Sequence, residues 1–166
     1  MPYPGGNVIR VTPTLHAAAS ADDDVLFQTT EIPNAVNERG GASKLISVNF
    51  TCKQALALNI DLVIMEVDTD WNDGTLGNTL NISDDDLVSC KPLGILQWDG
   101  AQVTLNGNEM NMFTNAALAS NAPGQLPMIL KAAAGSRSVY FTAIDRDGGD
   151  TFVNGDLTFT FGIEYL

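Results

Sequence analysis

The sequence predicts an all-β protein built as a sandwich of two antiparallel sheets, and two observations lead to that prediction. Residues 156–166 alternate strictly between apolar and polar or small side chains, and residues 44–53 alternate in the same way. A strand places successive side chains on opposite faces of a sheet, so each run has one apolar face. The last run carries Phe159, Phe161 and Tyr165 on that face. Three aromatics need a second layer to cover them, which favours two packed sheets.

The amino-terminal residues predict an arm followed by the sandwich. Residues 1–7 are rich in Pro and Gly, which suit neither a helix nor a central strand, so we expect an extended arm there. Residues 8–12 alternate and predict an edge strand, and residues 25–32 predict the next strand. The 166 residues favour one domain with a sizeable core. We therefore expect a single sandwich domain over residues 8–166.

Two strands are predicted in the middle of the chain. In the run 44–53, one face holds Ile46, Val48, Phe50 and Cys52, and the opposite face holds Leu45, Ser47, Asn49 and Thr51. Residues 54–59 are expected to be a hairpin connection. Residues 60–67 have only Asp61 and Glu66 as polar members, which predicts a central strand buried on both faces.

One short helix is predicted near 83–91. Ser83 can cap the free backbone N–H groups, and Asp84, Asp85 and Asp86 place carboxylates beside the positive end of the helix dipole. Pro92 is expected to end the helix after about two turns.

The remaining strands are predicted from short apolar runs. Residues 93–98 and 102–105 are expected to form a hairpin across an Asp-Gly dipeptide. Residues 126–131 and 138–145 predict two strands joined by a short Ala/Gly/Ser turn. The segment 106–124 gives no assignment.

The charge balance excludes one class of partner. Twenty acidic residues face eight basic ones, giving a net charge of −12, and such a surface repels phosphate backbones. We therefore expect no nucleic-acid partner.

No stretch of about eighteen apolar residues predicts a membrane span, and the first residues lack a signal peptide's basic and apolar regions. Cys52 and Cys90 make no disulfide framework, so we expect two small buried hydrophobes.

No residue pattern indicates catalysis or a resident cofactor. His16 is the only histidine and lies in a small-residue loop, which argues against Ser-His-Asp or Cys-His catalysis. Two cysteines and one distant histidine do not provide a zinc site. No glycine-rich phosphate-binding motif is present. We expect no enzyme, no catalytic residue, no cofactor and no bound metal.

Calcium is the one ligand that a stretch of the chain suggests. The oxygen-rich run 68–74 resembles the start of an EF-hand loop and holds Asp68, Asp70, Asn72 and Asp73. Its glycine comes one place late, and Thr79 stands where the loop needs an acid. Asp145, Asp147 and Asp150 form a second acidic group. Because Asp, Asn and Gly are also what turns require, we interpret both segments as turns.

Trp71 is a candidate contact residue because it lies in a polar loop. An exposed tryptophan there would anchor a protein partner, and the alternative is packing over the edge of its own core. Trp98 ends an apolar strand and is expected in the core.

From about residue 30 onward, the chain resembles a family of small virion structural proteins of tailed bacteriophages. The matching stretches, in order, are Ile32-Pro33-Asn34-Ala35-Val36, Gly40-Gly41, Asp61-Leu62-Val63-Ile64, Leu80-Asn81-Ile82-Ser83-Asp84-Asp85-Asp86 with Leu93-Gly94, Leu126-Pro127-Met128-Ile129-Leu130-Lys131, and Asp156-Leu157-Thr158-Phe159-Thr160-Phe161-Gly162. Their order and spacing carry the resemblance more than any single stretch does. Residues 1–7 and 106–124 match least well.

The resemblance implies a jelly-roll-like sandwich that works as a capsid decoration or cement protein. Such a protein is made in the host cytoplasm, lies on the exterior of the virion, and binds the major capsid protein and copies of itself, here expected as a homotrimer. The candidates for subunit contact are Tyr3, Pro4, Trp71, Met112 and Phe113. Two alternatives remain open: a tail or head-to-tail joining protein, and a host-glycan-binding module.

Overall fold

The computed structural model describes residues 5–16, 18–54, 56, 58–71, 79–99, 103–104, 111–114 and 126–166. Of these, it describes 99, 103–104 and 111–114 by their backbone alone. Its elements are β1 (Gly6–Val11), β2 (Thr30–Ile32), β3 (Ala42–Cys52), β4 (Asn59–Met65), α1 (Asp84–Ser89), β5 (Pro92–Asp99), β6 (Val103–Thr104), β7 (Asn111–Thr114), β8 (Met128–Lys131), β9 (Val139–Asp145) and β10 (Leu157–Tyr165). The predicted all-β class with one short helix is confirmed.

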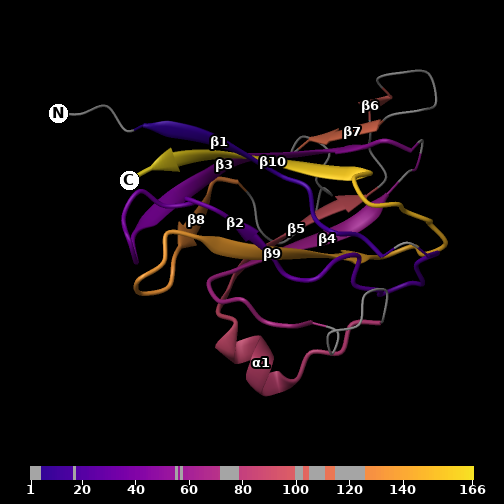
Figure 1. The fold of residues 1–166 in the computed structure, drawn as a ribbon, viewed down its shortest axis with the longest axis horizontal. Helices are drawn as coiled ribbons and strands as arrows, with labels where there is room; N and C mark the ends of the chain where they lie inside the picture. The colour runs from indigo at the N-terminus through magenta and orange to yellow at the C-terminus, as the bar shows by residue number, and fades with distance from the viewer. Residues whose placement is uncertain are drawn as a thin grey trace.

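The strands form two packed antiparallel sheets (Figure 1). The six-stranded sheet has the order β1-β10-β3-β7-β6, with β8 also paired to β3, and the four-stranded sheet has the order β2-β9-β4-β5. The first half of the chain thus pairs with the second half in reverse, as β1 with β10, β2 with β9, β3 with β8 and β4 with β5. Successive pairs fall in alternate sheets, which is the winding of a jelly roll.

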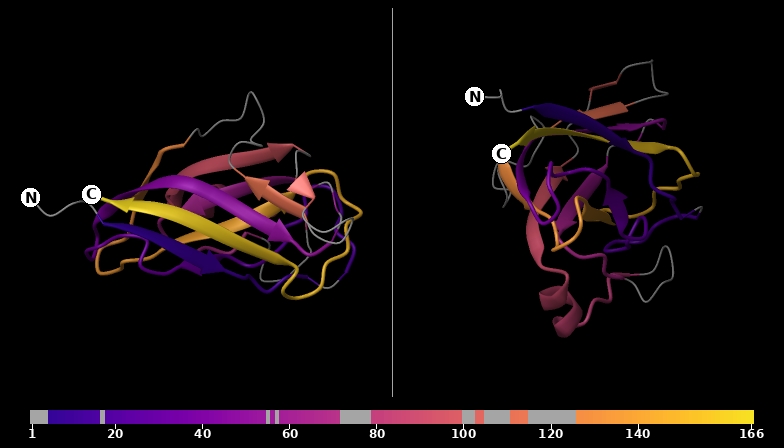
Figure 2. Two further views of the ribbon diagram at one scale, coloured as in Figure 1. Left: turned by 90° about the horizontal axis from the view of Figure 1, so that it is seen from above. Right: turned by 60° about the vertical axis from the view of Figure 1, so that its left-hand side comes forward.

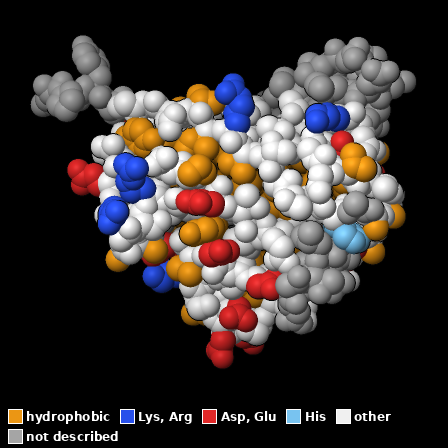
Figure 3. All heavy atoms as spheres, viewed as in Figure 1, with side chains coloured by type: hydrophobic (Ala, Val, Ile, Leu, Met, Phe, Trp, Pro, Cys, Tyr) orange, Lys and Arg blue, Asp and Glu red, His pale blue; other side chains and the backbone are white. Residues whose placement is uncertain are grey.

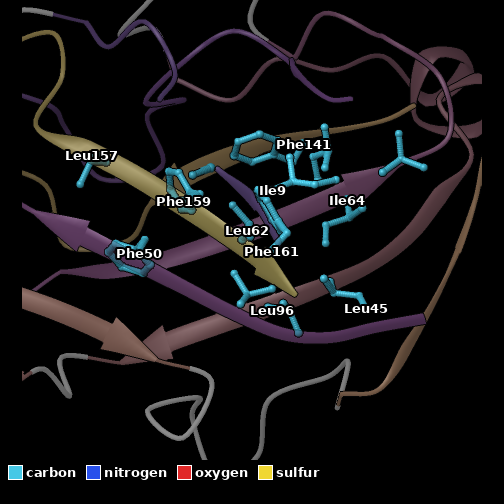
Figure 4. Packing of buried hydrophobic residues seen from close by; sticks show 14 of the residues in the cluster. Ile9, Leu45, Phe50, Leu62, Ile64, Leu96, Phe141, Leu157, Phe159 and Phe161 are labelled. Atoms are coloured by element: carbon cyan, nitrogen blue, oxygen red, sulfur yellow. The ribbon is translucent and has the colours of Figure 1, made fainter. Parts of the chain in front are cut away.

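An aromatic cluster fills the space between the two sheets. Phe159 on β10 lies at its centre and is fully buried. Its ring has neighbours on both sheets, with centroid distances of 5.2 Å to Phe50 on β3, 5.2 Å to Phe141 on β9 and 5.6 Å to Phe27. Figure 4 shows Phe50 and Phe159 of the six-stranded sheet in the same layer of side chains as Leu62 and Leu96 of the four-stranded sheet. The alternation of the last strand therefore does place its apolar face in the core.

The central strand β4 is buried on both of its faces, as predicted. Ile60, Leu62 and Ile64 belong to the core between the sheets. Val63 and Met65 face the other way, into a second cluster that includes Trp71 and Cys90. Residues from the segment between β4 and β5 therefore cover the side of the four-stranded sheet that points away from the main core.

A bulge in β3 overturns part of the predicted facing of this strand. Ser47 pairs with Gly162 and Leu45 pairs with Ile163, so Ile46 has no partner position on β10. An extra residue shifts the alternation by one, because side chains repeat every second residue. Leu45 is therefore buried and Ile46 is exposed, the reverse of the prediction, while Val48, Phe50 and Cys52 face the core as expected.

Neither predicted hairpin forms. β3 and β4 belong to different sheets, so residues 53–58 connect the sheets instead of turning back within one. β5 pairs with β4, whereas β6 pairs with β7 in the six-stranded sheet. Between β3 and β4, and again between β5 and β6, the chain crosses from one sheet to the other, and a local turn signal does not reveal that crossing.

Other strand and helix ends move by a few residues. β1 begins at Gly6, two residues earlier than predicted. Only the last three residues of the segment 25–32 form a strand, because Val25 and Phe27 make single bridges to two different segments. The helix ends at Ser89, before Lys91 with its φ of 51°, and Pro92 opens β5 instead of ending the helix directly. β7 lies within the unassigned segment 106–124.

Candidate functional site

The outward surface of the six-stranded sheet is the candidate contact site, and we call it the outer face. Figure 2 shows β1, β10 and β3 side by side across it in the view from above. Three large apolar side chains are exposed there: Val8 at 58%, Ile46 at 48% and Ile129 at 54%. None of the described segments covers these residues in the way that the β4–β5 segment covers the other sheet.

Strand register places the three apolar residues near one another. Val8 pairs with Gly162 on β10, and Gly162 pairs with Ser47 on β3. A Cβ built on Gly162 would meet Oγ of Ser47 first and would lie 3.6 Å from Cγ1 of Ile46, so both side chains reach the space beside the glycine. Val8 and Ile46 therefore lie on either side of Gly162, and the Ser47 hydroxyl lies with them.

Ile129 extends this apolar group along β8. It pairs with Lys44, two residues before Ile46, so the two isoleucines are diagonal neighbours. Diagonal positions in an antiparallel pair are about 7–8 Å apart, within reach of long side chains. We call Val8, Ile46 and Ile129 together the apolar strip.

Basic side chains border the apolar strip. Arg10 lies on β1 two residues after Val8, Lys44 lies on β3, and Lys131 lies on β8 two residues after Ile129. The acid among them is Glu164, whose Oε1 is 3.5 Å from Nζ of Lys44. A chain with a net charge of −12 therefore carries more bases than acids at this strip. Figure 3 shows Asp and Glu side chains gathering instead toward the lower end of the molecule.

The predicted contact residue Trp71 packs onto its own sheet. It is 5% exposed and belongs to the second cluster, on the side of the four-stranded sheet that points away from the main core. Of the two interpretations of Trp71, the structure shows the packing one, and a contact with another subunit stays a prediction. Trp98 is 2% exposed and lies in the main core, as expected.

The other four predicted contact residues are only partly placed. Met112 and Phe113 lie in β7, in register with Thr51 and Phe50 on β3, and their side chains are outside what the structure describes. Tyr3 and Pro4 lie outside the described residues. Their proposed contacts stay predictions.

Sequence reasoning missed the outer face because of the bulge and the sheet assignments. Ile46 was expected on the same face as Val48 and Phe50, and Ile129 had no predicted neighbour. The one local signal was Gly162, which stands among threonines and a glutamate on the polar face of β10. A glycine within a strand is a marker of a bulge or a close approach.

Three carboxylates converge at the end of β9, as the sequence hinted. The side chains of Asp145, Asp147 and Asp150 place their oxygens within 4.8 Å of one another, a set of donors of the kind that hard cations take. Turn contacts already occupy much of it. Asp145 accepts hydrogen bonds from the Ser20 hydroxyl and, at 3.3 Å each, from the backbone N–H groups of Asp147 and Gly148.

Burial, and after it the crowding of negative charge, raises two pKa values in this turn. Burial, followed by the hydrogen bond and charge of Asp145 and the charge of Asp150, raises the pKa of Asp147 to about 6. Burial and Asp145 also raise the pKa of Asp150. The other calcium candidate, the run 68–74, is described only for Asp68 and Asp70 among its acids, both exposed.

Acidification is expected to stabilise this turn. A carboxyl group whose folded-state pKa is raised takes up its proton at a higher pH in the folded than in the unfolded state, so the free energy of unfolding rises as the pH falls from 7 toward 4. Asp147→Asn should therefore be more stable than the wild type at pH 7, with the difference shrinking at pH 4 in urea titrations. Glu38→Gln, in an exposed loop, is the control. A pH-independent difference for Asp147→Asn would contradict this account.

Both cysteines are free and buried, as expected. Burial raises the pKa of the Cys52 thiol to about 11 and also raises the pKa of Cys90. The thiolate is the nucleophilic form, so neither side chain has the properties of a reactive cysteine.

The sequence matches no protein-family model and no curated protein. No helix among the described residues has the length and apolar character that crossing a membrane requires.

Proposed function

We propose that the protein is a non-enzymatic structural subunit of a tailed-bacteriophage particle, specifically a decoration or cement protein on the outside of the capsid that bridges capsid subunits. One observation carries the proposal: among the described residues, none covers the apolar strip with its basic border on the six-stranded sheet of a strongly acidic chain. Exposed apolar patches with a polar rim mark interaction sites. The resemblance described above supplies the kind of particle, and the jelly-roll winding agrees with it.

The physical role follows from what a filled shell must resist. A cement protein opposes swelling by burying apolar surface between subunits, which contributes about 25 cal/mol per Å² before the cost of association. Many copies on one particle strengthen a modest single-site affinity. The acidic remainder of the surface keeps the protein hydrated and repels unspecific partners.

A glycan-binding module finds less support. Sugar recognition of the stacking kind needs exposed aromatic rings, and the chain's two tryptophans, Trp71 and Trp98, are 5% and 2% exposed. A tail or head-to-tail joining subunit would use the same sandwich in a ring, and it stays the alternative.

Density-gradient purification of particles tests the proposal. The protein is expected to migrate with intact particles in a fixed ratio to the capsid protein, and to dissociate under conditions that leave the shell closed. Recovery of the protein only in the particle-free fractions would contradict it, and recovery only with detached tails would favour the alternative.

A further inference from the structure

Helix α1 exposes an apolar and acidic surface that the fold does not use. None of its six residues is buried. Leu87 and Val88 are 41% and 76% exposed, and Asp84 lies three and four residues before them. Residues at these spacings share one face of a helix, so Asp84, Leu87 and Val88 form one exposed face, with Asp85 beside it.

This surface lies on the opposite side of the molecule from the outer face. Figure 1 and the right-hand view of Figure 2 both show α1 projecting beyond the four-stranded sheet, away from β1 and β10. No basic residue occupies the last turn of α1, and its first turn is formed by Asp84, Asp85 and Asp86. The α1 surface thus carries mainly acids and the outer face mainly bases around exposed apolar side chains, with Lys91 paired to Glu66 on one side and Glu164 paired to Lys44 on the other.

We propose that the outer face of one copy binds helix α1 of a second copy. The apolar strip of Val8, Ile46 and Ile129 receives Leu87 and Val88, and the basic border receives the carboxylates. Lys44 and Lys131 are the bases nearest Ile129, because one pairs with it and the other follows it by two residues. Complementary charge directs the acidic α1 to the outer face, because most of the remaining surface of the chain is acidic and would repel α1.

The contact is heterologous, because the two surfaces differ and lie on opposite sides. Each added copy leaves one outer face and one α1 free, so the assembly grows to a ring or a row and does not stop at two. This inference rests on the same outer face as the proposed function, but it is tested separately, since self-association is measured without particles.

Charge-exchange variants test the contact by sedimentation velocity over a concentration series. The variant Lys44→Glu/Lys131→Glu places acids against α1, and the variant Asp84→Lys/Asp85→Lys places bases against the outer face. Each variant alone is expected to associate roughly tenfold more weakly than the wild type, because like charges then face each other. An equimolar mixture of the two is expected to regain association, because the outer face of each variant then meets an α1 of opposite charge on the other variant.

Controls separate this contact from a general effect of net charge. Lys53→Glu/Arg137→Glu and Asp22→Lys/Glu38→Lys make the same charge changes at exposed loop positions, and they should associate as the wild type does. Far-ultraviolet circular dichroism checks that each variant keeps its fold. A wild type that stays monomeric at every concentration, variants that associate normally, or a mixture that does not regain association would each overturn the inference.

Discussion

Phe159→Ala is expected to lower the free energy of unfolding by about 3–5 kcal/mol. The ring is fully buried and touches aromatic rings from both sheets, so removing it leaves a cavity where the two layers meet. Backbone pairing on both sides of β10, with β1 and β3, hinders the strand from closing that space. Urea unfolding followed by the fluorescence of the two buried tryptophans, Trp71 and Trp98, measures the loss.

Phe159→Leu is the matched variant for this position. It keeps an apolar side chain and should lose less than the alanine variant, because the remaining cavity is smaller. Thr160→Ala, one residue along on the opposite face of β10, is the control and should change stability by less than about 1 kcal/mol. Equal losses of stability at Phe159 and Thr160 would mean that the Phe159 side chain does not pack against a second sheet.

Gly148→Ala is expected to destabilise the protein far more than Gly149→Ala. Both residues have positive φ, of 63° and 87°, where an alanine costs about 1–2 kcal/mol. A Cβ on Gly148 would also lie 2.6 Å from the backbone N of Asp22 and 2.8 Å from the backbone C of Ala21, whereas a Cβ on Gly149 would meet nothing within 4 Å. Overpacking against backbone adds about 1–3 kcal/mol more.

The difference between these two neighbours is the informative quantity. It isolates the contact between the 145–150 turn and the segment at Ala21 and Asp22, because the strain from positive φ is common to both variants. Thermal unfolding of the two variants in parallel measures it. Similar stabilities would show that the two segments do not touch as described.

Elements with a strong local pattern were predictable from sequence. The alternation of Phe159, Phe161 and Ile163, the nearly continuous apolar run of β4, and the Ser83 cap before three aspartates each determine a local structure without reference to the rest of the chain. The Ser83 hydroxyl indeed accepts the backbone N–H of Asp86 at 3.1 Å.

Features that depend on distant pairing were not predictable. Whether β3 and β4 share a sheet depends on β8, β9 and β10, which follow much later in the chain. The exposure of Ile46 depends on a register shift opposite Gly162, because a shift of one residue moves side chains from one face of the sheet to the other. The outer face combines Val8, Ile46 and Ile129 from three strands, so no single stretch of sequence predicts it.

The proposed function makes the burst temperature of particles the most direct measurement. Particles stripped of this protein are expected to release their genome at a lower temperature than complete particles, and adding the purified protein back should restore the original temperature. Identical burst temperatures for complete, stripped and reconstituted particles would contradict the claim that this jelly roll works by holding shell subunits together.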